Sequence, residues 1–395
     1  MYSYLLILNP MKKLAIVTSH PIQYNAPWFR LLAKANKTEI KVFYTWSQTE
    51  VGNTYDPGFK KNISWDIPLL DGYDYSFVNN ISTNPGSGHF KGIINPTLIT
   101  EIVTWQADAV LVFGWAFSSH LKCIRYFKGK IPVMFRGDST LLRTQSFIKK
   151  IIRALFLKWI YSYVDYAFYV GTANKSYFKK YGLKEQQLLF APHAVDNDRF
   201  IGKGDEFDLA ALVWKEELGI SASEFVVLFA GKLETIKKPE FIIQLANKLK
   251  DLPIKFVFVG NGSKENELKE TTKNDARFIF IDFQNQLKMP IVYRLANLFI
   301  LPSISETWGL SVNEAMASGL AVAVSSSCGC AIDLVYKDIN GYVFDENNIY
   351  QCEDELRKLC NNNTYKKMGI ASREIILSYS FTNIVKSIYT KLIAI

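Results

Sequence analysis

The chain has 395 residues, a formal net charge of +9 and a hydrophobic content of 49%. This length suits two domains of ordinary size, and the composition is that of a globular protein. Because no uninterrupted apolar run reaches the roughly 18 residues of a membrane span, we expect a soluble or peripheral protein rather than an integral membrane protein.

The five cysteines are odd in number and form neither CxxC pairs nor a set with matching histidines. We therefore expect no disulfide frame, no zinc site and a cytosolic location. The positive excess lies in residues 1–200. Nucleic acid, an anionic membrane and an anionic substrate would each suit this charge, and the charge alone does not choose among them. Residues 1–10 precede a second methionine, and we interpret them as a start extension without a function.

In the first half of the chain, apolar runs typical of strands alternate with helix-like stretches. The predicted strands are residues 14–18, 40–45, 109–113, 131–135 and 166–170. The predicted helices are residues 26–35, 97–105, 118–127 and 147–163. This alternation predicts a parallel sheet covered by helices in residues 1–200. The interval 47–95 is irregular and rich in Gly, Asn, Asp, Tyr and Pro, and an irregular interval of this length is usually a functional loop.

The second half repeats the alternation after a polar stretch, residues 201–223, that we interpret as a hinge. The predicted strands are residues 225–230, 255–259, 278–281, 298–301 and 320–324, and helical stretches include 240–250 and 290–296. A second doubly wound domain over residues 201–377 follows from this pattern. Residues 378–395 carry apolar side chains at helical spacing and predict a terminal helix.

The segment most informative about function is residues 303–319, SISETWGLSVNEAMASG. Its pattern changes from strand-like to helical at Gly309, and Glu314 lies about half a turn from the apolar face of that helix. We therefore expect Glu314 to point away from the core. Glu306 lies just beyond the strand end, where parallel sheets bind ligands. The free N–H groups at Gly309 and Leu310 suit an anion such as a diphosphate. The alternative is a surface helix with two solvated glutamates.

Glu306 and Glu314, within SETWGLSVNEAMASG, resemble the paired-glutamate signature of the retaining glycosyltransferases of family 4, which have the GT-B fold. The resemblance implies an α/β chain of two Rossmann-like domains facing a cleft. Residues 1–200 would form the acceptor side, residues 201–377 would bind the nucleotide sugar, and the helix in residues 378–395 would return to the first domain. It also implies a role in polysaccharide biosynthesis.

The resemblance further implies roles for individual residues of the second domain. Glu314 would hold the ribose hydroxyls of the donor, and Glu306 would orient the transferred sugar. Lys232, which takes the place of an Arg of the family, and Lys237 would grip the diphosphate. A solvated basic turn is the alternative for these lysines. The other predicted donor-binding positions are Trp308, Gly231, Gly260, Asn261, Phe283 and Gln284.

In the first domain the predictions are less specific. Arg136 and Asp138 end a strand where the family places a histidine that contacts the transferred sugar, so either could make that contact or the two could form a structural pair. His20 follows the first strand and could face phosphate or acceptor, or be structural. Residues 196–198 match the metal-binding DxD pattern, but they lie in the segment that crosses between domains. We therefore expect no bound metal. We also expect no bound cofactor, because the nucleotide-diphosphate sugar, of UDP or GDP type, would be the donor substrate.

The remaining predictions concern partners and rival functions. Lys149, Lys150 and Arg153 share an arc of the predicted helix at residues 147–164, which suits either an anionic membrane on the inner face of the cell or a plain core-facing helix. The acceptor would be a glycan or a lipid-linked glycan. One rival is a sugar-nucleotide epimerase of similar shape. A second rival, a basic nucleic-acid binder, is disfavoured because no such binding motif is present.

Overall fold

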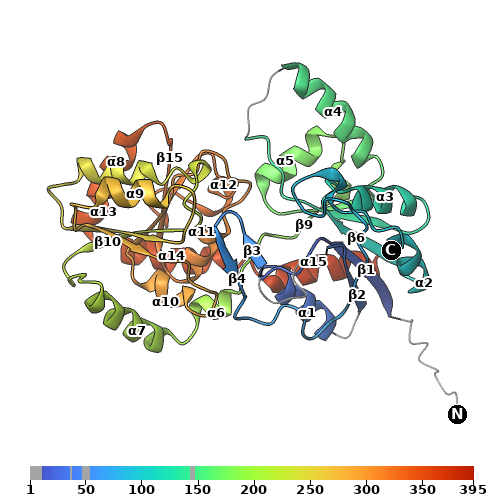
Figure 1. Cartoon of the computed structure of the whole chain (residues 1–395), viewed down its shortest axis with the longest axis horizontal. Coiled ribbons are helices and arrows are strands. Elements are labelled where there is room, and N and C mark those ends of the chain that lie inside the picture. The colour runs from blue at the N-terminus through green and yellow to red at the C-terminus, as the bar shows by residue number, and fades with distance from the viewer. Residues whose placement is uncertain (1–10, 36–37, 47–53, 143–146) are drawn as a thin grey trace, which may run out of the picture.

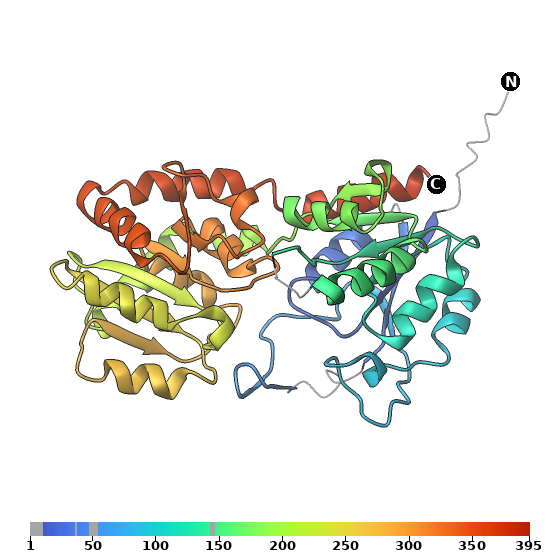
Figure 2. The ribbon, with the colours of Figure 1, turned by 90° about the horizontal axis from the view of Figure 1, so that it is seen from above.

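The structure, a computed structural model, describes residues 11–35, 38–46, 54–142 and 147–395, and the side chains of residues 147–150 lie outside this description. The start extension predicted for residues 1–10 also lies outside the described residues. Two α/β domains lie side by side, as the views in Figure 1 and Figure 2 both show. The predicted two-domain architecture is therefore confirmed.

The first domain is built on a parallel sheet. Within the described residues this sheet has seven strands in the order β5-β2-β1-β6-β7-β8-β9. Their bounds are β1 (Lys12–Thr18), β2 (Thr38–Tyr44), β5 (Asp74–Phe77), β6 (Ala109–Phe113), β7 (Val133–Arg136), β8 (Tyr166–Tyr169) and β9 (Leu188–Phe190). The main helices are α1 (Ala26–Lys34), α2 (Leu98–Thr104), α3 (Ser118–Phe127), α4 (Phe147–Tyr161) and α5 (Thr172–Lys180). Because helices cover both faces, the central strands are continuous apolar runs.

The second domain repeats this plan. Its six described strands run parallel in the order β12-β11-β10-β13-β14-β15. Their bounds are β10 (Phe225–Ala230), β11 (Ile254–Val259), β12 (Phe278–Ile281), β13 (Leu298–Leu301), β14 (Ala321–Ser325) and β15 (Gly341–Phe344). The helices are α7 (Gly204–Glu217), α8 (Glu240–Lys248), α9 (Glu265–Thr272), α10 (Met289–Arg294), α11 (Leu310–Ala317), α12 (Ala331–Leu334), α13 (Ile349–Asn362) and α14 (Tyr365–Ile376). All six residues of β10 are buried, which places this strand in the domain core.

The chain crosses between the domains twice. The short helix α6 (Asn197–Ile201) follows the first crossing, and α15 (Phe381–Ile393) follows the second. Ile384, Ile388 and Leu392 of α15 are buried in one cluster with Trp28 and Phe29 of α1. Figure 1 shows α15 among the elements of the first domain. The terminal helix therefore returns to the first domain, as predicted.

Two intervals that we read as irregular contain regular structure. The predicted hinge at residues 201–223 holds α7, which buries Ala211 and half-buries Phe207 and Trp214. Because Leu209, Leu212 and Val213 are apolar but exposed, the helical period of this buried face is not visible in the sequence. The described part of the interval 47–95 holds β5 and an antiparallel hairpin, β3 (Thr54–Asp56) with β4 (Lys61–Ile63). Strands of three or four residues are too short to show a periodic pattern.

Candidate active site

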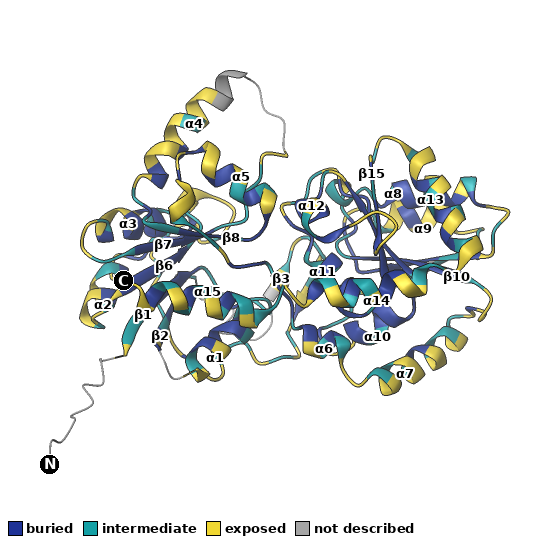
Figure 3. Cartoon of the chain, turned by 180° about the vertical axis from the view of Figure 1, so that it is seen from behind, coloured by how far each residue is buried: buried dark blue, intermediate teal, exposed yellow. Residues whose placement is uncertain are grey.

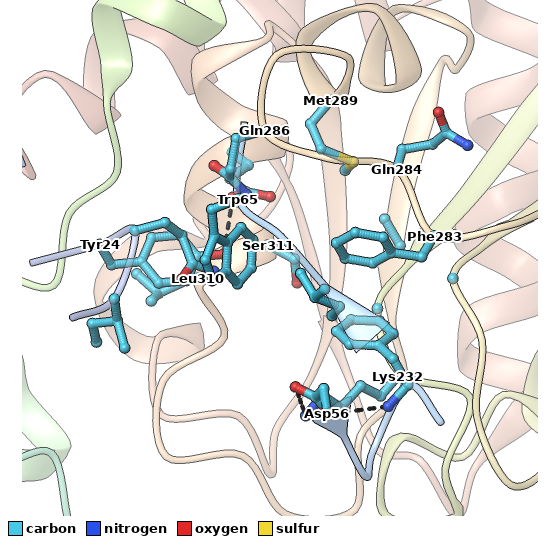
Figure 4. A pocket seen from close by; sticks show the side chains of 18 of the residues that line it. Tyr24, Asp56, Trp65, Lys232, Phe283, Gln284, Gln286, Met289, Leu310 and Ser311 are labelled. Carbon is cyan, nitrogen blue, oxygen red and sulfur yellow. Dashed lines mark hydrogen bonds and ion pairs between the residues drawn. The ribbon is translucent and has the colours of Figure 1, made fainter. Parts of the chain in front are cut away.

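A cavity of about 970 Å³ lies between the domains and is lined by residues of both, as Figure 4 shows for part of its wall. Most of the predicted site residues line it. These are His20, Gly231, Lys232, Lys237, Gly260, Phe283, Gln284, Glu306, Gly309, Leu310 and Glu314. Arg136, Asp138, Asn261 and Trp308 are not among the lining residues. Its position beyond the carboxyl ends of the parallel strands is the usual ligand position in such sheets.

The strand ends of the second domain bring backbone close to the cavity. Gly231 follows β10, and Gly260 follows β11 with a φ of 125°. A Cβ at Gly260 would lie 2.2 Å from the carbonyl oxygen of Gly231. A side chain at this position would collide with the backbone, so the glycine lets the two loops lie against each other at the cavity wall.

Glu306 lies in the loop between β13 and α11 and forms an ion pair with Lys237. Both side chains are shielded, at 17% and 23% exposed respectively. The backbone of Glu306 is also fixed, because its N–H donates to Ser327 O at 3.1 Å and its carbonyl accepts from Gly329 N at 3.0 Å. A carboxylate from this loop and an ammonium from the turn after β10 thus lie together at the cavity. The carboxylate can face a sugar hydroxyl, and the ammonium can face an anion.

Glu314 is not solvated, although it points out of the second-domain core toward the cavity as expected. It is only 4% exposed, and its two carboxylate oxygens accept hydrogen bonds from Tyr24 Oη at 3.1 Å and Tyr293 Oη at 2.8 Å. Burial raises the pKa of Glu314, whereas the two tyrosine hydrogen bonds act in the opposite direction. The alternative of a surface helix with two solvated glutamates is therefore wrong. Glu314 faces the cavity and, through Tyr24, the first domain.

Asn261 supports the site instead of lining it. Its amide nitrogen donates to Asp282 Oδ1 at 3.0 Å and to Glu265 Oε2 at 2.9 Å. Its amide oxygen accepts from the backbone N–H of Phe283 at 2.9 Å. Asn261 therefore ties the loop after β11 to the loop after β12 and fixes the position of Phe283 at the cavity.

Trp308 also has a packing role. Its indole Nε1 donates to Asn313 Oδ1 at 2.8 Å, and the residue is 3% exposed. A Cβ at Gly171 of the first domain would lie 2.3 Å from the Trp308 ring. The tryptophan therefore packs tightly against the first domain beside the Glu306 loop, which is not the direct donor contact that we predicted.

Arg136 is 4% exposed and committed to the first domain. Its guanidinium donates to the carbonyl oxygens of Ala191 at 2.8 Å and Pro192 at 2.9 Å. Burial lowers its pKa to about 10 and the nearby Asp138 opposes this shift. This placement favours a structural role for Arg136, which fixes the crossing segment, over a contact with the transferred sugar.

Asp138 meets the second domain at a point that sequence reasoning missed. Its Oδ2 accepts from Thr307 Oγ1 at 2.9 Å and lies 3.7 Å from His193 Nε2. Burial disfavours ionisation of Asp138, but His193 and the Thr307 hydrogen bond outweigh it and lower the pKa of Asp138 to about 2. Burial lowers the pKa of His193. Because Thr307 follows Glu306, this contact connects the first domain to the Glu306 loop.

His20 lies on the first-domain wall of the cavity. Its Nδ1 is 3.0 Å from Ser19 Oγ, and its ring meets Trp46 edge to face at 5.4 Å between centroids. Burial lowers the pKa of His20, which favours the neutral imidazole. A neutral imidazole can donate or accept a hydrogen bond toward the cavity.

The DxD match serves the domain crossing. Asp196 accepts from the backbone N–H of Arg199 at the start of α6, and Asn197 donates to the carbonyls of Ile376 and Tyr379 at 3.1 and 3.2 Å. Across the part of the chain that the structure describes, no group of three or more His, Cys, Asp or Glu side chains is arranged to hold a metal ion.

Helix α4 has one side packed in the core and one side exposed. Leu157 and Ile160 are fully buried, whereas Ile152 and Leu155 are 65% and 66% exposed. Figure 3 shows the exposed part of α4 standing away from the domain. Arg153 donates to Tyr177 Oη at 3.4 Å, and the side chains of Lys149 and Lys150 lie outside the described part of the helix. Among the described helices, none is long and apolar enough to cross a membrane.

The second domain resembles a known protein family. Residues 212–375 match the family model described as "Glycosyl transferases group 1". A 174-residue stretch is 28% identical to the UDP-Gal:alpha-D-GlcNAc-diphosphoundecaprenol alpha-1,3-galactosyltransferase of Escherichia coli, covering 41% of this chain and 42% of that protein. The chain spans about half or less of the length of the curated relatives that it matches.

The solved structures extend the similarity to both domains. Sucrose-phosphate synthase from Thermosynechococcus elongatus superposes with a TM-score of 0.72 at 15% identity, over 97% of this chain and 99% of that one. Anabaena HepE in complex with UDP-glucose gives 0.68 at 14% identity, over 97% and 100%. The narrower assignment to family 4 stays a prediction. The chain has the GT-B fold, and residues 212–375 of its second domain match glycosyl transferases group 1.

Proposed function

We propose that the protein is a retaining glycosyltransferase that moves a sugar from a nucleotide-diphosphate sugar to a glycan or lipid-linked glycan in cell-surface polysaccharide synthesis. The observation that carries this proposal is that Lys232, Lys237, Glu306 and Glu314 all line one cavity between the domains. The match of residues 212–375 to glycosyl transferases group 1 supports it.

The second-domain wall of the cavity carries groups that can bind each part of the donor. Lys232, Lys237 and the start of α11 supply positive charge for the diphosphate. Glu314 can accept hydrogen bonds from the ribose hydroxyls, and the loop around Phe283 would contact the base. Charge that grows on the departing diphosphate would be stabilised by the two ammonium groups and by backbone N–H groups, so no metal is required.

The Glu306–Lys237 pair lies where the transferred sugar meets the diphosphate in this arrangement. Glu306 would hold a sugar hydroxyl and so orient the anomeric carbon toward the acceptor. Lys237 would follow the leaving phosphate oxygen. The acceptor would attack on the face that the diphosphate leaves, which retains the configuration of the sugar.

The first-domain wall suits a neutral sugar acceptor. It presents the aromatic rings of His20, Trp46, Tyr55 and Trp65, and its described lining residues include no Lys or Arg. Flat rings with a few polar groups are typical of sites that hold a ligand by its apolar faces and orient it by hydrogen bonds. A neutral hydroxyl of a glycan is therefore the acceptor group that we propose.

A lipid-linked acceptor would bring the protein to the inner face of the membrane. The exposed side of α4 presents Ile152, Leu155, Phe156 and Trp159, and Arg125 lies 5.3 Å from the Trp159 ring. Apolar and aromatic side chains beside basic ones are typical of helices that lie in the membrane interface. We propose that this side of α4 contacts anionic lipid.

The function can be tested by thermal unfolding with UDP, GDP and ADP. A nucleoside diphosphate present at 100 times its dissociation constant adds about 2.7 kcal/mol of stability. We expect one of the three to raise the melting temperature, and a single-stranded oligonucleotide to leave it unchanged. Stabilisation by the oligonucleotide alone would favour a nucleic-acid binder. Conversion of a sugar nucleotide without an acceptor would favour an epimerase.

A further inference from the structure

Residues 54–66, here named the arm, belong to the first domain in sequence but contact the second. β3 and β4 pair with each other from Thr54 to Ile63 and belong to neither large sheet. Figure 1 shows them between the two domains. The arm therefore extends across the cavity, and the residues that it touches show what it does there.

Polar contacts attach the arm to the loop that follows β12. Lys61 Nζ lies 2.9 Å from Asp282 Oδ2, and the backbone N–H of Leu287 donates to Asp66 Oδ2 at 3.0 Å. Asn285 adds a hydrogen bond of 2.6 Å to a carbonyl of the arm. These contacts run along the loop that we assign to the base of the donor.

Aromatic contacts cover the same loop. The ring of Phe59 lies 4.8 Å from that of Phe283, and the ring of Trp65 lies 6.3 Å from it, both edge to face. Phe283 is thus packed against the arm and also lines the cavity. A nucleobase that takes the place of Phe59 on this ring would break the contact between Phe283 and the arm.

The tip of the arm carries Asp56, whose Oδ1 lies 2.8 Å from Lys232 Nζ. Figure 4 shows the two side chains pointing toward each other. The same carboxylate accepts from the backbone N–H groups of Gly58 at 2.8 Å and Phe59 at 3.1 Å, so the turn itself fixes its position. A Cβ at Gly58 would lie 2.5 Å from Lys232 Cδ, which shows how tightly the tip sits on this lysine.

We propose that Asp56 is a further residue of the donor site, which occupies Lys232 in the absence of donor and is displaced by a donor phosphate. The inference rests on the proposed function. A carboxylate and a phosphate are both anionic oxygen acceptors, and a lysine ammonium is a compact point charge. Binding both anions at once would bring two negative charges together, which is unfavourable in a shielded site.

Displacement of Asp56 would affect the whole arm. The ion pair with Lys232, the Lys61–Asp282 pair and the Phe59–Phe283 contact all lie on one hairpin, residues 54–63. A donor that takes Lys232 with its phosphate and Phe283 with its base competes with two contacts of the arm, both near its tip. Asp56 therefore lowers donor affinity and limits the site to ligands that can replace both contacts.

The opposite role for the arm predicts the opposite effect. If the arm were a permanent wall that completes the nucleotide site, Asp56 would hold Lys232 in place for the phosphate. Loss of its charge would then weaken nucleotide binding. The sign of the change in affinity on neutralising Asp56 separates the two roles.

The test is calorimetric titration of UDP, GDP and ADP into the wild type, Asp56→Asn and Asp74→Asn. In Asp56→Asn the amide oxygen of the new side chain can still accept from the Gly58 and Phe59 N–H groups, so the turn is kept and only the charge is lost. The matched control is Asp74 of β5, which lies 3.6 Å from Lys41 Nζ of β2 and does not line the cavity. We expect Asp56→Asn to bind the preferred nucleotide roughly two- to tenfold more tightly, and Asp74→Asn to bind like the wild type.

Hydrogen exchange gives a second readout. Nucleotide should increase exchange of the backbone amides in residues 54–66 of the wild type, because the arm is released. Unchanged or weaker binding by Asp56→Asn, or slower exchange in the arm on adding nucleotide, would overturn this inference while leaving the glycosyltransferase proposal standing. Failure of all three nucleotides to bind either protein would overturn both.

Discussion

Replacement of Glu314 by Gln is expected to weaken donor binding about ten- to a hundredfold while preserving the fold. Glu314 accepts hydrogen bonds from Tyr24 and Tyr293, at 3.1 and 2.8 Å. Gln has the same length, and it can accept from one hydroxyl and donate to the other. The change therefore removes the charge and little else. A hydrogen bond between a ribose hydroxyl and a carboxylate contributes about 1.5–3 kcal/mol, which sets the expected loss of affinity.

Alanine would be a less informative substitution at this position. Glu314→Ala leaves the hydroxyls of the buried Tyr293 and the half-buried Tyr24 without their acceptor, and for the buried one this costs about 1–3 kcal/mol. A loss of donor binding in that variant would combine a missing contact with a rearranged interface between the domains. Tyr293→Phe is the matched control, because it removes one hydrogen bond to the carboxylate and keeps the charge.

The assay combines two measurements on each variant. Calorimetric titration with UDP, GDP and ADP gives the dissociation constant, and thermal unfolding reports whether the fold is intact. The ribose assignment predicts that Glu314→Gln melts close to the wild type but binds the preferred nucleotide at least tenfold more weakly, whereas Tyr293→Phe changes binding much less. A Glu314→Gln protein that melts normally and binds within twofold of the wild type would refute the assignment.

Five further outcomes are expected. Lys237→Ala should lower kcat/KM by about a hundredfold, or on the order of 3 kcal/mol, which is more than the effect of Glu314→Gln. The reason is that the Lys237 ammonium faces charge that grows in the transition state. Equal kcat for mutant and wild type would contradict this role. Lys232→Arg should be tolerated, and activity should survive EDTA after thorough demetallation; rescue by Mg²⁺ or Mn²⁺ after a loss would assign the diphosphate to a metal. Burial lowers the pKa of His120 to about 4, below its unfolded value of about 6.5. The unfolded chain therefore takes up a proton first as the pH falls. The free energy of unfolding is unaffected above pH 6.5 and decreases by about 3 kcal/mol as the pH falls to 4. Urea unfolding of His120→Gln should lack this pH dependence, and an unchanged slope would contradict it. Binding to anionic liposomes should fall when Leu155 becomes Ser and when salt is raised, and sedimentation that ignores both would assign the exposed side of α4 to another role.

The strands that the sequence predicted best are continuous apolar runs. The bounds predicted for β6, β10, β12 and β13 match the structure, because parallel strands under helices are apolar along their length. This holds even for β12, which lies at the edge of its sheet and is partly buried. α7 was missed because exposed apolar side chains lie between its buried ones and because charged side chains are frequent in it, which together hide the helical period. The β3–β4 hairpin was missed because its partners are residues of the other domain, which leave no local periodicity.

The candidate site follows the same division. Glu306, Glu314 and Lys237 were found because one local motif and one turn after a strand carry them. Tyr24 and Asp56 were missed as site residues, since each meets its partner across the cavity and across 290 and 176 residues of sequence respectively. A contact between two domains produces no regular residue spacing in the sequence, so the sequence does not predict it. Trp308 and Asn261 lie in the predicted motifs, but their side chains do not line the cavity. Trp308 packs against the first domain, and Asn261 fixes the loop that carries Phe283.

The most direct test of the proposed function is transfer of a labelled sugar. UDP-, GDP- and ADP-linked sugars are incubated with glycan and lipid extracts, and label in the acceptor and free nucleoside diphosphate are measured for the wild type and for Glu306→Gln. We predict that one nucleotide class gives equal amounts of labelled acceptor and nucleoside diphosphate with the wild type, and far less of both with Glu306→Gln. No release above the Glu306→Gln level, or conversion of the donor into another sugar nucleotide without acceptor, would contradict a glycosyltransferase.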